Sequence, residues 1–411
     1  MKRYDFKATI LLGMLTTVTQ ACGGGGGGGG GGGMPQPTPM EFDRRALLSS
    51  YTDRVVLPAL RQFATDAASL QAATAALATA AAGGSDAPTE LQNARAAWRT
   101  AMGSWQEIEV LQVGPAGSPT MVMGGQGLRD EIYSWPIVNP CRVDQETVSG
   151  DYEDDDFFDR ELVNTRGLAA IEYLLFDDDE DNACGTGVDI NTGGTWAALI
   201  ASGDLLFRRS GYAAGAAADV AKHAVELRDA WEPSAGNFAA QLSRAGLSGS
   251  QFDTAQDAVN DVFAGLFYVE LRVKDDKLAS PAGISPDCSN DVCPDLRESL
   301  FADASREHIL SNLRVAQRVF RGGGDTTGVG FDDFLRALGA GVLADRMAAN
   351  LSASITAVEA IPGTFGSALA EDPDSVRDAH AALKLFTDDL KSQFVSVLNL
   401  EIPQEGAGDN D

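Results

Sequence analysis

The stretch "NARAAWRTAMGSWQEIEVLQVGP", residues 93–115, carries its large apolar side chains on one face of a helix. Apolar residues recur there at spacings of three and four, at Leu91, Ala94, Trp98, Ala101, Trp105 and Ile108. Comparable stripes run from Val56 to Leu77 and from Val376 to Val397. This spacing is typical of helices that bury one face in an antiparallel bundle, and strand patterns are scarce. The sequence therefore predicts an all-α fold.

The remaining helices and loops follow from the same periodicity and from clusters of glycine, proline and acidic residues. Further helices are expected at about 155–176, 196–230, 250–276, 295–321 and 329–360. Loops are expected at 82–88, 113–127, 139–154, 177–195, 278–294 and 322–330. Pro58 predicts a helix start or a kink. A boundary at 177–195 or at 278–294 would divide the chain into two bundles.

The N-terminus has the pattern of an export signal. Lys2, Arg3 and Lys7 precede a short apolar run, which is too short to span a bilayer. The signal segment ends at Cys22, in residues that resemble a bacterial lipoprotein box. We therefore expect a signal peptide at 1–21 and lipidation of Cys22. Residues 22–43 form a Gly/Pro-rich tether, whose eleven glycines reach about 20 Å.

The cysteine count agrees with export. Without Cys22, four cysteines remain, an even number that two disulfides would use completely. Cys288 and Cys293 lie in one polar loop, so a local bridge is the simplest pairing, and Cys141 then pairs with Cys184. The Cys-x-x-Cys spacing of a structural zinc site is absent.

The net charge of −28 limits the partners of the protein. Nucleic acid and bare anionic lipid are repelled by such a field, whereas cations or a basic protein are attracted. The acidic runs at 151–159 and 177–182 offer hard oxygen ligands for calcium or ferric ions. Neither run has the EF-hand pattern, and solvated acidic loops are the alternative interpretation.

Signatures of the common hydrolases are missing. The three histidines, His223, His308 and His380, form no His-Glu-x-x-His pair. A Gly-x-Ser-x-Gly nucleophile elbow and a free cysteine for a thiol protease are absent as well. We therefore interpret the histidines as surface or helix-packing residues.

One acidic residue stands out within an apolar segment. In "TRGLAAIEYLLF", residues 165–176, Glu172 is the only acid between Gly167 and Phe176. A buried carboxylate is costly unless it is paired, hydrogen-bonded or protonated. Its partner could be an arginine such as Arg95 or Arg306, or a bound ligand or metal ion.

Several blocks of the sequence together resemble imelysin-like proteins in order and approximate spacing. These blocks are residues 93–115, "LRDEIYSWPIVNPCRVD" at 128–144, residues 165–176, "LRESLFADASREHILSNLRVAQRVFRG" at 296–322 and the tail "LNLEIPQEGAGDND". The resemblance covers nearly all of the chain after residue 45. It implies two antiparallel four-helix-bundle-like halves packed together at 44–400, followed by an acidic tail at 401–411. It also implies a bacterial envelope protein, often a lipoprotein, in a family classed as metallopeptidases and linked to iron uptake.

The family hallmark, Gly-x-His-x-x-Glu, falls on Gly167, Ala169 and Glu172, so alanine stands at the histidine position. Histidine and glutamate three apart on a helix could chelate one metal ion, and a methyl group cannot. The resemblance therefore predicts a noncatalytic protein of the cell envelope, in the outer membrane, that binds a ligand, a divalent or ferric metal ion, or an envelope partner.

The candidate ligand-binding residues surround Glu172, which is also the candidate metal ligand. They are Glu172, Gly167, Ala169, Trp135, Pro136, Ser299, Ser305 and Arg306, of which Trp135 and Pro136 match the Trp-Pro element of the family. Two alternatives remain open at this point. One is a metallopeptidase with substituted ligands, and the other is a purely structural surface module.

Overall fold

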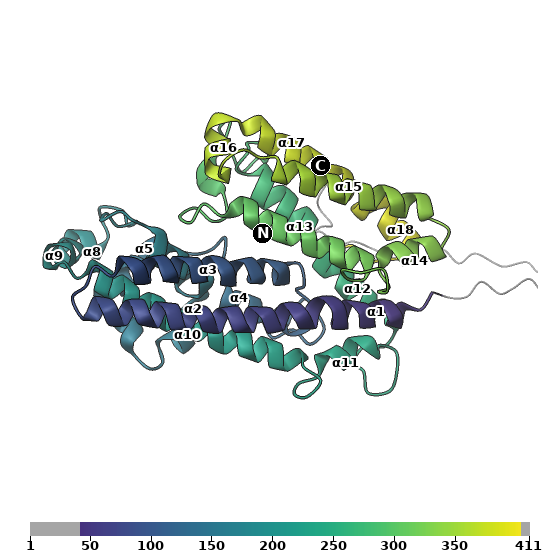
Figure 1. Ribbon diagram of the computed structural model, residues 1–411, viewed down its shortest axis with the longest axis horizontal. Helices are drawn as coiled ribbons and strands as arrows, with labels where there is room; N and C mark the ends of the chain where they lie inside the picture. Colours follow the sequence, from purple (N-terminus) through teal and green to yellow (C-terminus); the bar gives the residue numbers. More distant parts are fainter. Residues whose placement is uncertain (1–41, 404–411) are drawn as a thin grey trace, which may run out of the picture. The chain divides into compact units, whose positions relative to one another are not determined.

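A computed structural model describes residues 42–403 of the protein. The signal peptide, nearly all of the tether and residues 404–411 of the tail lie outside the described residues. Between residues 42 and 403 the regular structure is helical and contains no strand, which confirms the predicted all-α fold (Figure 1).

The longer helices carry most of the chain. They are α1 (Arg44–Tyr51), α2 (Leu57–Ala82), α3 (Pro88–Glu109), α5 (Pro140–Ser149), α7 (Gly167–Phe176), α9 (Thr195–Ser202), α10 (Leu205–Trp231), α12 (Ala255–Leu266), α13 (Ser305–Arg321), α15 (Gly341–Glu359) and α17 (Pro373–Asp389). Short α-helices are α4 (Leu128–Ile132), α6 (Phe157–Arg160), α8 (Asp189–Thr192), α11 (Phe238–Ser243), α14 (Phe331–Ala337), α16 (Phe365–Glu371) and α18 (Val395–Leu398). The π-helical segments are η1 (Thr52–Val56), η5 (Val269–Ala279) and η7 (Leu390–Phe394), and the 3-10 turns are η2 (Gly114–Ala116), η3 (Asp151–Glu153), η4 (Val163–Thr165) and η6 (Pro294–Leu296).

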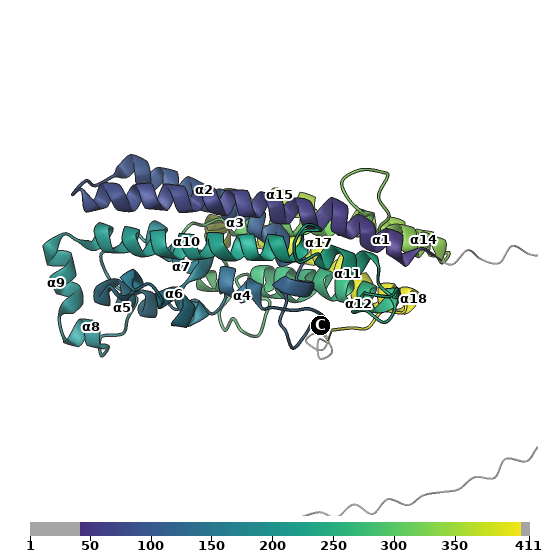
Figure 2. The ribbon, with the colours of Figure 1, turned by 90° about the horizontal axis from the view of Figure 1, so that it is seen from below.

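The helices pack in two groups. In the first group, α10 packs on both α2 and α7, and α3 packs on the same two helices. Figure 2 shows α2 and α10 running side by side over most of their lengths. The predicted stripes face inward, since Phe63 of α2 and Trp105 of α3 are fully buried with ring centroids 5.0 Å apart. The periodicity thus identified this core correctly.

The second group consists of η5, α13, α15 and α17, in which α15 packs on both α13 and α17. Phe320 and Phe386 meet edge to face in its core, with centroids 6.2 Å apart. The two groups join where α13 packs against α3. The side chains of α3 that face α13 therefore lie at the junction of the two groups.

Several predicted element boundaries need correction. The helix expected at 155–176 is interrupted, because residues 161–166 connect α6 to α7 through extended residues on either side of the 3-10 turn η4. The helix expected from 295 begins only at Ser305, and the loop expected at 139–154 contains α5. Asn139 accounts for α5, because its side chain caps the helix by accepting the amide N–H of Arg142. Pro58 lies in the first turn of α2, as its fixed φ favours.

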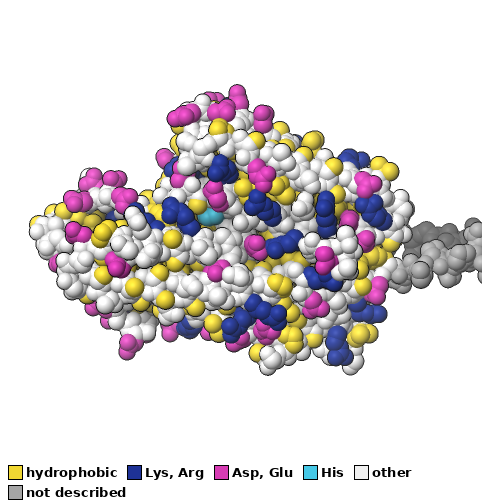
Figure 3. All heavy atoms as spheres, in the orientation of Figure 1, with side chains coloured by type: hydrophobic (Ala, Val, Ile, Leu, Met, Phe, Trp, Pro, Cys, Tyr) yellow, Lys and Arg dark blue, Asp and Glu magenta, His cyan; other side chains and the backbone are white. Residues whose placement is uncertain are grey.

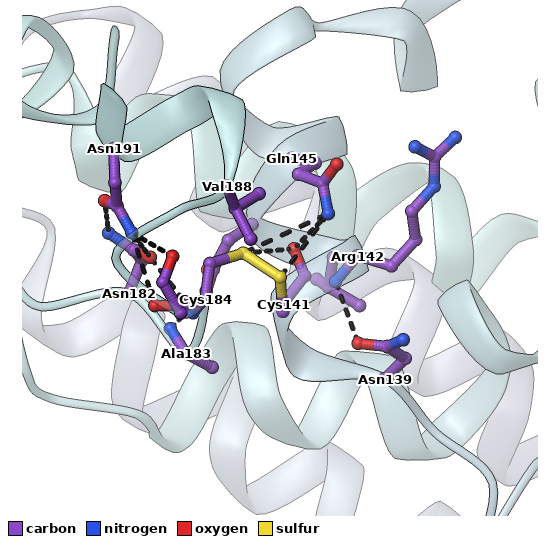
Figure 4. The surroundings of a disulfide bond; sticks show 12 residues. Asn139, Cys141, Arg142, Gln145, Asn182, Ala183, Cys184, Val188 and Asn191 are labelled. Carbon is purple, nitrogen blue, oxygen red and sulfur yellow. Dashed lines mark hydrogen bonds between the residues drawn. A yellow bond between two sulfur atoms is a disulfide. The ribbon is translucent and has the colours of Figure 1, made fainter. Parts of the chain in front are cut away.

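Both predicted disulfides are present, Cys141 with Cys184 and Cys288 with Cys293. The first joins α5 to the acidic loop after α7 (Figure 4). Asn182 and Asn191 hold this loop by a side-chain hydrogen bond of 2.8 Å. The loop before α8 is therefore fixed covalently to α5 and by a hydrogen bond to α8.

Charge is unevenly distributed on the face shown in Figure 3. Acidic side chains gather over the end formed by α8 and α9 and over α16, whereas arginine and lysine side chains lie along the middle. Among the helices of residues 42–403, none combines the length and apolar character needed to cross a membrane.

Candidate functional site

The segment that carries Glu172 is positioned by a glycine. Gly167, the first residue of α7, has φ +75°, and a Cβ there would lie 2.7 Å from the carbonyl oxygen of Ile132. Only glycine tolerates both the backbone conformation and this close approach of α4. All ten residues of α7 are buried, Glu172 and Ala169 included.

The carboxylate of Glu172 is held by the loop that precedes α13. Its Oε1 accepts hydrogen bonds from the Ser299 hydroxyl at 3.0 Å and from the backbone N–H groups of Phe301 and Ala302 at 3.1 and 2.9 Å. Burial raises the pKa of Glu172, and these bonds together with nearby His308 oppose the shift. Glu172 thus fastens α7 to residues 299–302.

The predicted arginine partners are wrong. Arg95 donates to the carbonyl of Leu175 at 2.6 Å and pairs with Asp178. Arg306 donates to the carbonyls of Ile361 and Gly363, at 3.0 and 2.6 Å, and pairs with Glu307. Both guanidinium groups donate to other acceptors. Oε1 of Glu172 instead accepts from one hydroxyl and two backbone N–H groups, which are uncharged donors.

Glu298, which directly precedes Ser299 in the chain, is a second buried carboxylate that the sequence did not reveal. Its Oε1 accepts from Gln106 Nε2 at 2.8 Å and from the Tyr133 hydroxyl at 2.8 Å, and it lies 3.0 Å from Lys277 Nζ. Its Oε2 lies 3.2 Å from His308 Nδ1. Burial alone would raise the pKa of Glu298, but Lys277 and His308 outweigh it and hold the pKa well below its usual range.

Lys277 completes this cluster from η5. Besides Glu298, its ammonium group donates to Gln106 Oε1 and to Asn312 Oδ1, both at 2.7 Å. Three acceptors match the three N–H donors of an ammonium, so the geometry requires the charged form. Burial lowers the pKa of Lys277, and Glu298 offsets part of that loss.

Another buried acid, Glu109, lies on α3 one helical turn after Gln106. Arg129 of α4 contacts it through Nε and Nη2 at 3.3 and 3.2 Å, and the Tyr268 hydroxyl donates to it at 2.8 Å. Arg129 Nη2 also donates to the carbonyl of Trp135 at 2.9 Å. The cluster around Glu298 and the cluster around Glu109 place charged groups along the junction of α3 with the second group of helices. We call these two clusters together the polar seam.

The sequence contained one signal for this seam. Gln106 and Glu109 interrupt the apolar stripe of α3 at positions that the helical period places among its buried residues. A polar residue on the buried face of a stripe needs a partner, so these two positions could have indicated a buried polar contact. The identity of the partners, which are Lys277, Glu298 and Asn312 for Gln106 and Arg129 and Tyr268 for Glu109, could not be inferred from spacing.

A cavity of about 490 Å³ opens beside the polar seam. Trp135 and Pro136 line it, as do Arg129 and Tyr268, which also bind Glu109. The other lining residues are Gln112, Ala116, Gly117, Ser118, Thr120, Met121, Val122, Gly127, Asp130, Ala264, Gly265, Phe267, Leu271, Arg272 and Pro403. We call it the Trp135 cavity.

The predicted site residues therefore do not form one site. Trp135 and Pro136 line the cavity, whereas Glu172 and Ser299 meet at the buried clamp and do not line it. Ser305 is buried, and its hydroxyl has no partner among the described residues. Arg306 binds the segment after α15, and Gly167 and Ala169 serve the packing of α7.

The residues present do not fit a resident metal ion. Within residues 42–403, no three His, Cys, Asp or Glu side chains are grouped so that they could hold one. Oε1 of Glu172 already accepts three hydrogen bonds, and position 169 offers only a methyl group. We therefore derive no chemistry from a metal at this place.

Two helical groups joined by a buried polar seam define a double-bundle protein, and comparisons with known proteins give its family. The family model described as Imelysin (Peptidase_M75) matches residues 56–394. The chain therefore belongs to the imelysin family. No curated protein matches it.

Solved structures agree in fold. An imelysin-like protein from Psychrobacter arcticum has a TM-score of 0.64 at 14% identity and covers 89% of this chain and 99% of its own. A candidate iron-regulated protein A precursor from Parabacteroides distasonis has a TM-score of 0.61 at 18% identity, with coverage of 88% and 97%. At these identities the likeness shows the fold alone.

Proposed function

We propose that this imelysin-family protein is a noncatalytic binding protein of the bacterial cell envelope, which holds a ligand in the Trp135 cavity. The observation that carries the proposal is the separation of the cavity from Glu172. The cavity is lined by Trp135 and Pro136, while Oε1 of Glu172, the carboxylate that a peptidase would use, accepts hydrogen bonds from three protein donors elsewhere. The volume of the cavity, about 490 Å³, lies in the range that is typical of small-molecule sites.

Residues 167–172 support the noncatalytic part of the proposal. Ala169 occupies the histidine position of the motif that the chain resembles, and a methyl group neither ligates a metal nor transfers a proton. Glu172 acts as a structural acceptor that fixes α7 to residues 299–302. A metallopeptidase with substituted ligands is the alternative outcome of the test below.

The envelope location rests on the N-terminal sequence and on the disulfides. Cys22 follows a short apolar signal and precedes eleven glycines, so a lipid on Cys22 would tether the helical body to the outer membrane. Cys141–Cys184 and Cys288–Cys293 suit an oxidising compartment. The iron-regulated name of one structural relative supports a link to iron acquisition, with an envelope protein as the partner.

The test compares the wild type with Ala264→Phe, which places a phenyl ring into the cavity. Each purified protein is incubated with an envelope extract of the native host, and retained small molecules are identified by mass spectrometry. We expect a molecule that the wild type retains and the variant loses. Metal content and proteolysis are measured on the same samples. A stoichiometric metal ion with chelator-sensitive cleavage abolished in Glu172→Gln would establish the peptidase, and neither ligand nor metal would leave the structural module.

The anchor has its own test. Cys22→Ser should move the protein from the membrane fraction to the soluble fraction, and labelled fatty acid should be incorporated only into the wild type. A wild type without the label contradicts the anchor and leaves the binding function untouched.

A further inference from the structure

The hydrogen-bond donors that Arg129 and Gln112 present to the Trp135 cavity can be counted one by one. Arg129 uses Nε and one Nη2 hydrogen on Glu109, the other Nη2 hydrogen on the carbonyl of Trp135, and one Nη1 hydrogen on Asp130 at 3.1 Å. A guanidinium has five N–H donors, so one on Nη1 remains. Gln112 also lines the cavity, and its side-chain amide makes no hydrogen bond with the described residues. The cavity thus offers unused N–H donors.

An anionic ligand does not fit these donors. The charge of Arg129 is balanced by Glu109, which is fully buried, and by Asp130. Arg272, the other cation on the wall, pairs with Asp276 at 2.7 Å. The protein as a whole carries a net charge of −28, which repels anions before they arrive.

A cationic ligand does not fit the aromatic wall either. The Lys277 ammonium lies 5.8 Å from the ring centroid of Trp135 and 5.4 Å from that of Tyr268. These rings therefore already interact with a buried cation, and a second cation against the same rings would be repelled by the first. The cavity rejects both signs of charge near its centre.

Apolar side chains also line the cavity, beside the hydroxyl groups of Ser118 and Thr120, which hydrogen-bond each other at 3.0 Å. Met121, Val122, Pro136, Phe267 and Leu271 line the cavity together with Trp135. Met121 is half exposed at 50%, and its unbranched side chain can adapt to ligands of different shape. An apolar or aromatic body would bury these surfaces.

We propose that the Trp135 cavity binds an uncharged amphipathic small molecule. Its apolar or aromatic body lies against Trp135, and its oxygen acceptors take the remaining Nη1–H of Arg129 and the amide N–H of Gln112. This inference rests on the proposed function, because it names the chemical class of ligand for the same cavity.

Three matched probes test the inference. N-acetyl-L-phenylalanine amide is neutral, N-acetyl-L-phenylalanine adds a negative charge, and L-phenylalanine amide adds a positive one. Binding is measured by calorimetry on the full chain carrying Cys22→Ser, which needs no detergent that would compete for an apolar cavity. We expect the neutral probe to bind about tenfold or more tightly than either charged probe.

Two variants locate the binding. Gln112→Leu keeps the side-chain volume and removes the amide, so affinity for the neutral probe should fall about fivefold, the value of one hydrogen bond. Gln126→Leu is the matched control, because Gln126 belongs to the same loop and does not line the cavity. Trp135→Leu should abolish binding, and circular dichroism with thermal melting checks that each variant is folded.

The outcomes separate this inference from the proposed function. A charged probe that binds more tightly than the neutral one, and loses affinity in Trp135→Leu, overturns the ligand class while the cavity remains a binding site. A neutral probe that does not bind, or binds equally well to Gln112→Leu, also overturns it. The proposed function is decided by its own test: it fails when Ala264→Phe retains the same molecules as the wild type, when the wild type retains none, or when chelator-sensitive cleavage establishes the peptidase.

Discussion

The ammonium of Lys277 lies 3.0 Å from Oε1 of Glu298, and both side chains are completely buried where the two groups of helices meet. Neither charge contacts water, so each depends on the other and on the neutral donors and acceptors around them. A pair of this kind makes the junction specific, because the two groups can dock only where every member of the cluster finds its partner.

Replacing Lys277 by methionine should therefore destabilise the protein by about 3–5 kcal/mol, the cost of leaving a buried carboxylate unpaired. Urea denaturation measures the loss. Lys222→Met is the control, because Lys222 pairs with Asp159 in an exposed position, where the cost should stay below about 1 kcal/mol. Equal losses in the two variants would show that the seam contributes no more than a surface pair.

Substitutions of Glu172 should distinguish its charge from its hydrogen bonds. Glu172→Gln keeps an oxygen for the three donors, whereas Glu172→Ala leaves them buried without an acceptor and should cost about 2–4 kcal/mol.

Burial raises the pKa of Glu172, so the folded state binds its proton more tightly than the unfolded state does. Stability of the wild type relative to Glu172→Gln should then decline as the pH rises above the ordinary glutamate value. Unfolding free energies between pH 4 and 8 test this. A relative stability that rises with pH would mean that the carboxylate is stabilised by a charge that the structure does not reveal.

Asp144 should titrate in the physiological range. Burial raises its pKa to about 6, against the lowering effect of hydrogen bonds from the Ala183 amide and the Tyr173 hydroxyl, both at 2.8 Å. The protonated form is favoured by folding, so its contribution is complete below about pH 4 and is lost as the pH rises through 6. The change should be roughly 3 kcal/mol at most. Asp144→Asn should flatten this dependence, and an NMR titration that places the carboxyl pKa near 4 would refute it.

The two disulfides should differ in their effect on stability. Cys141 and Cys184 are 43 residues apart, so the chain-entropy model predicts about 4 kcal/mol for their bridge. Cys288 and Cys293 are 5 apart, which gives about 2 kcal/mol. Paired alanine variants of each bridge, compared by urea denaturation, should therefore rank in that order. A larger loss from the Cys288–Cys293 pair would mean that local packing, and not loop closure, sets the contribution.

Sequence patterns predicted the long helices because their information is local. Residues three and four apart share a helix face whatever lies opposite, so the stripes of α2, α3 and α17 could be read directly. Boundaries were less predictable where a tertiary contact sets them. The interruption before α7 depends on Gly167 meeting the carbonyl of Ile132, a contact across 35 positions that no local pattern encodes.

The features of the candidate site also divide into those that the local sequence indicates and those that tertiary contacts set. The sequence by itself indicated that Glu172 needs a partner if it is buried, that Trp135 and Pro136 match the Trp-Pro element of the family, and that four cysteines can pair. Only the tertiary structure decided that the partner of Glu172 is Ser299 with two backbone amides, more than 120 positions away. It also placed Trp135 at a cavity separate from Glu172. The physical reason is that a hydrogen bond depends on atoms within about 3 Å, and only the docking of α13 on α3 brings such distant segments that close.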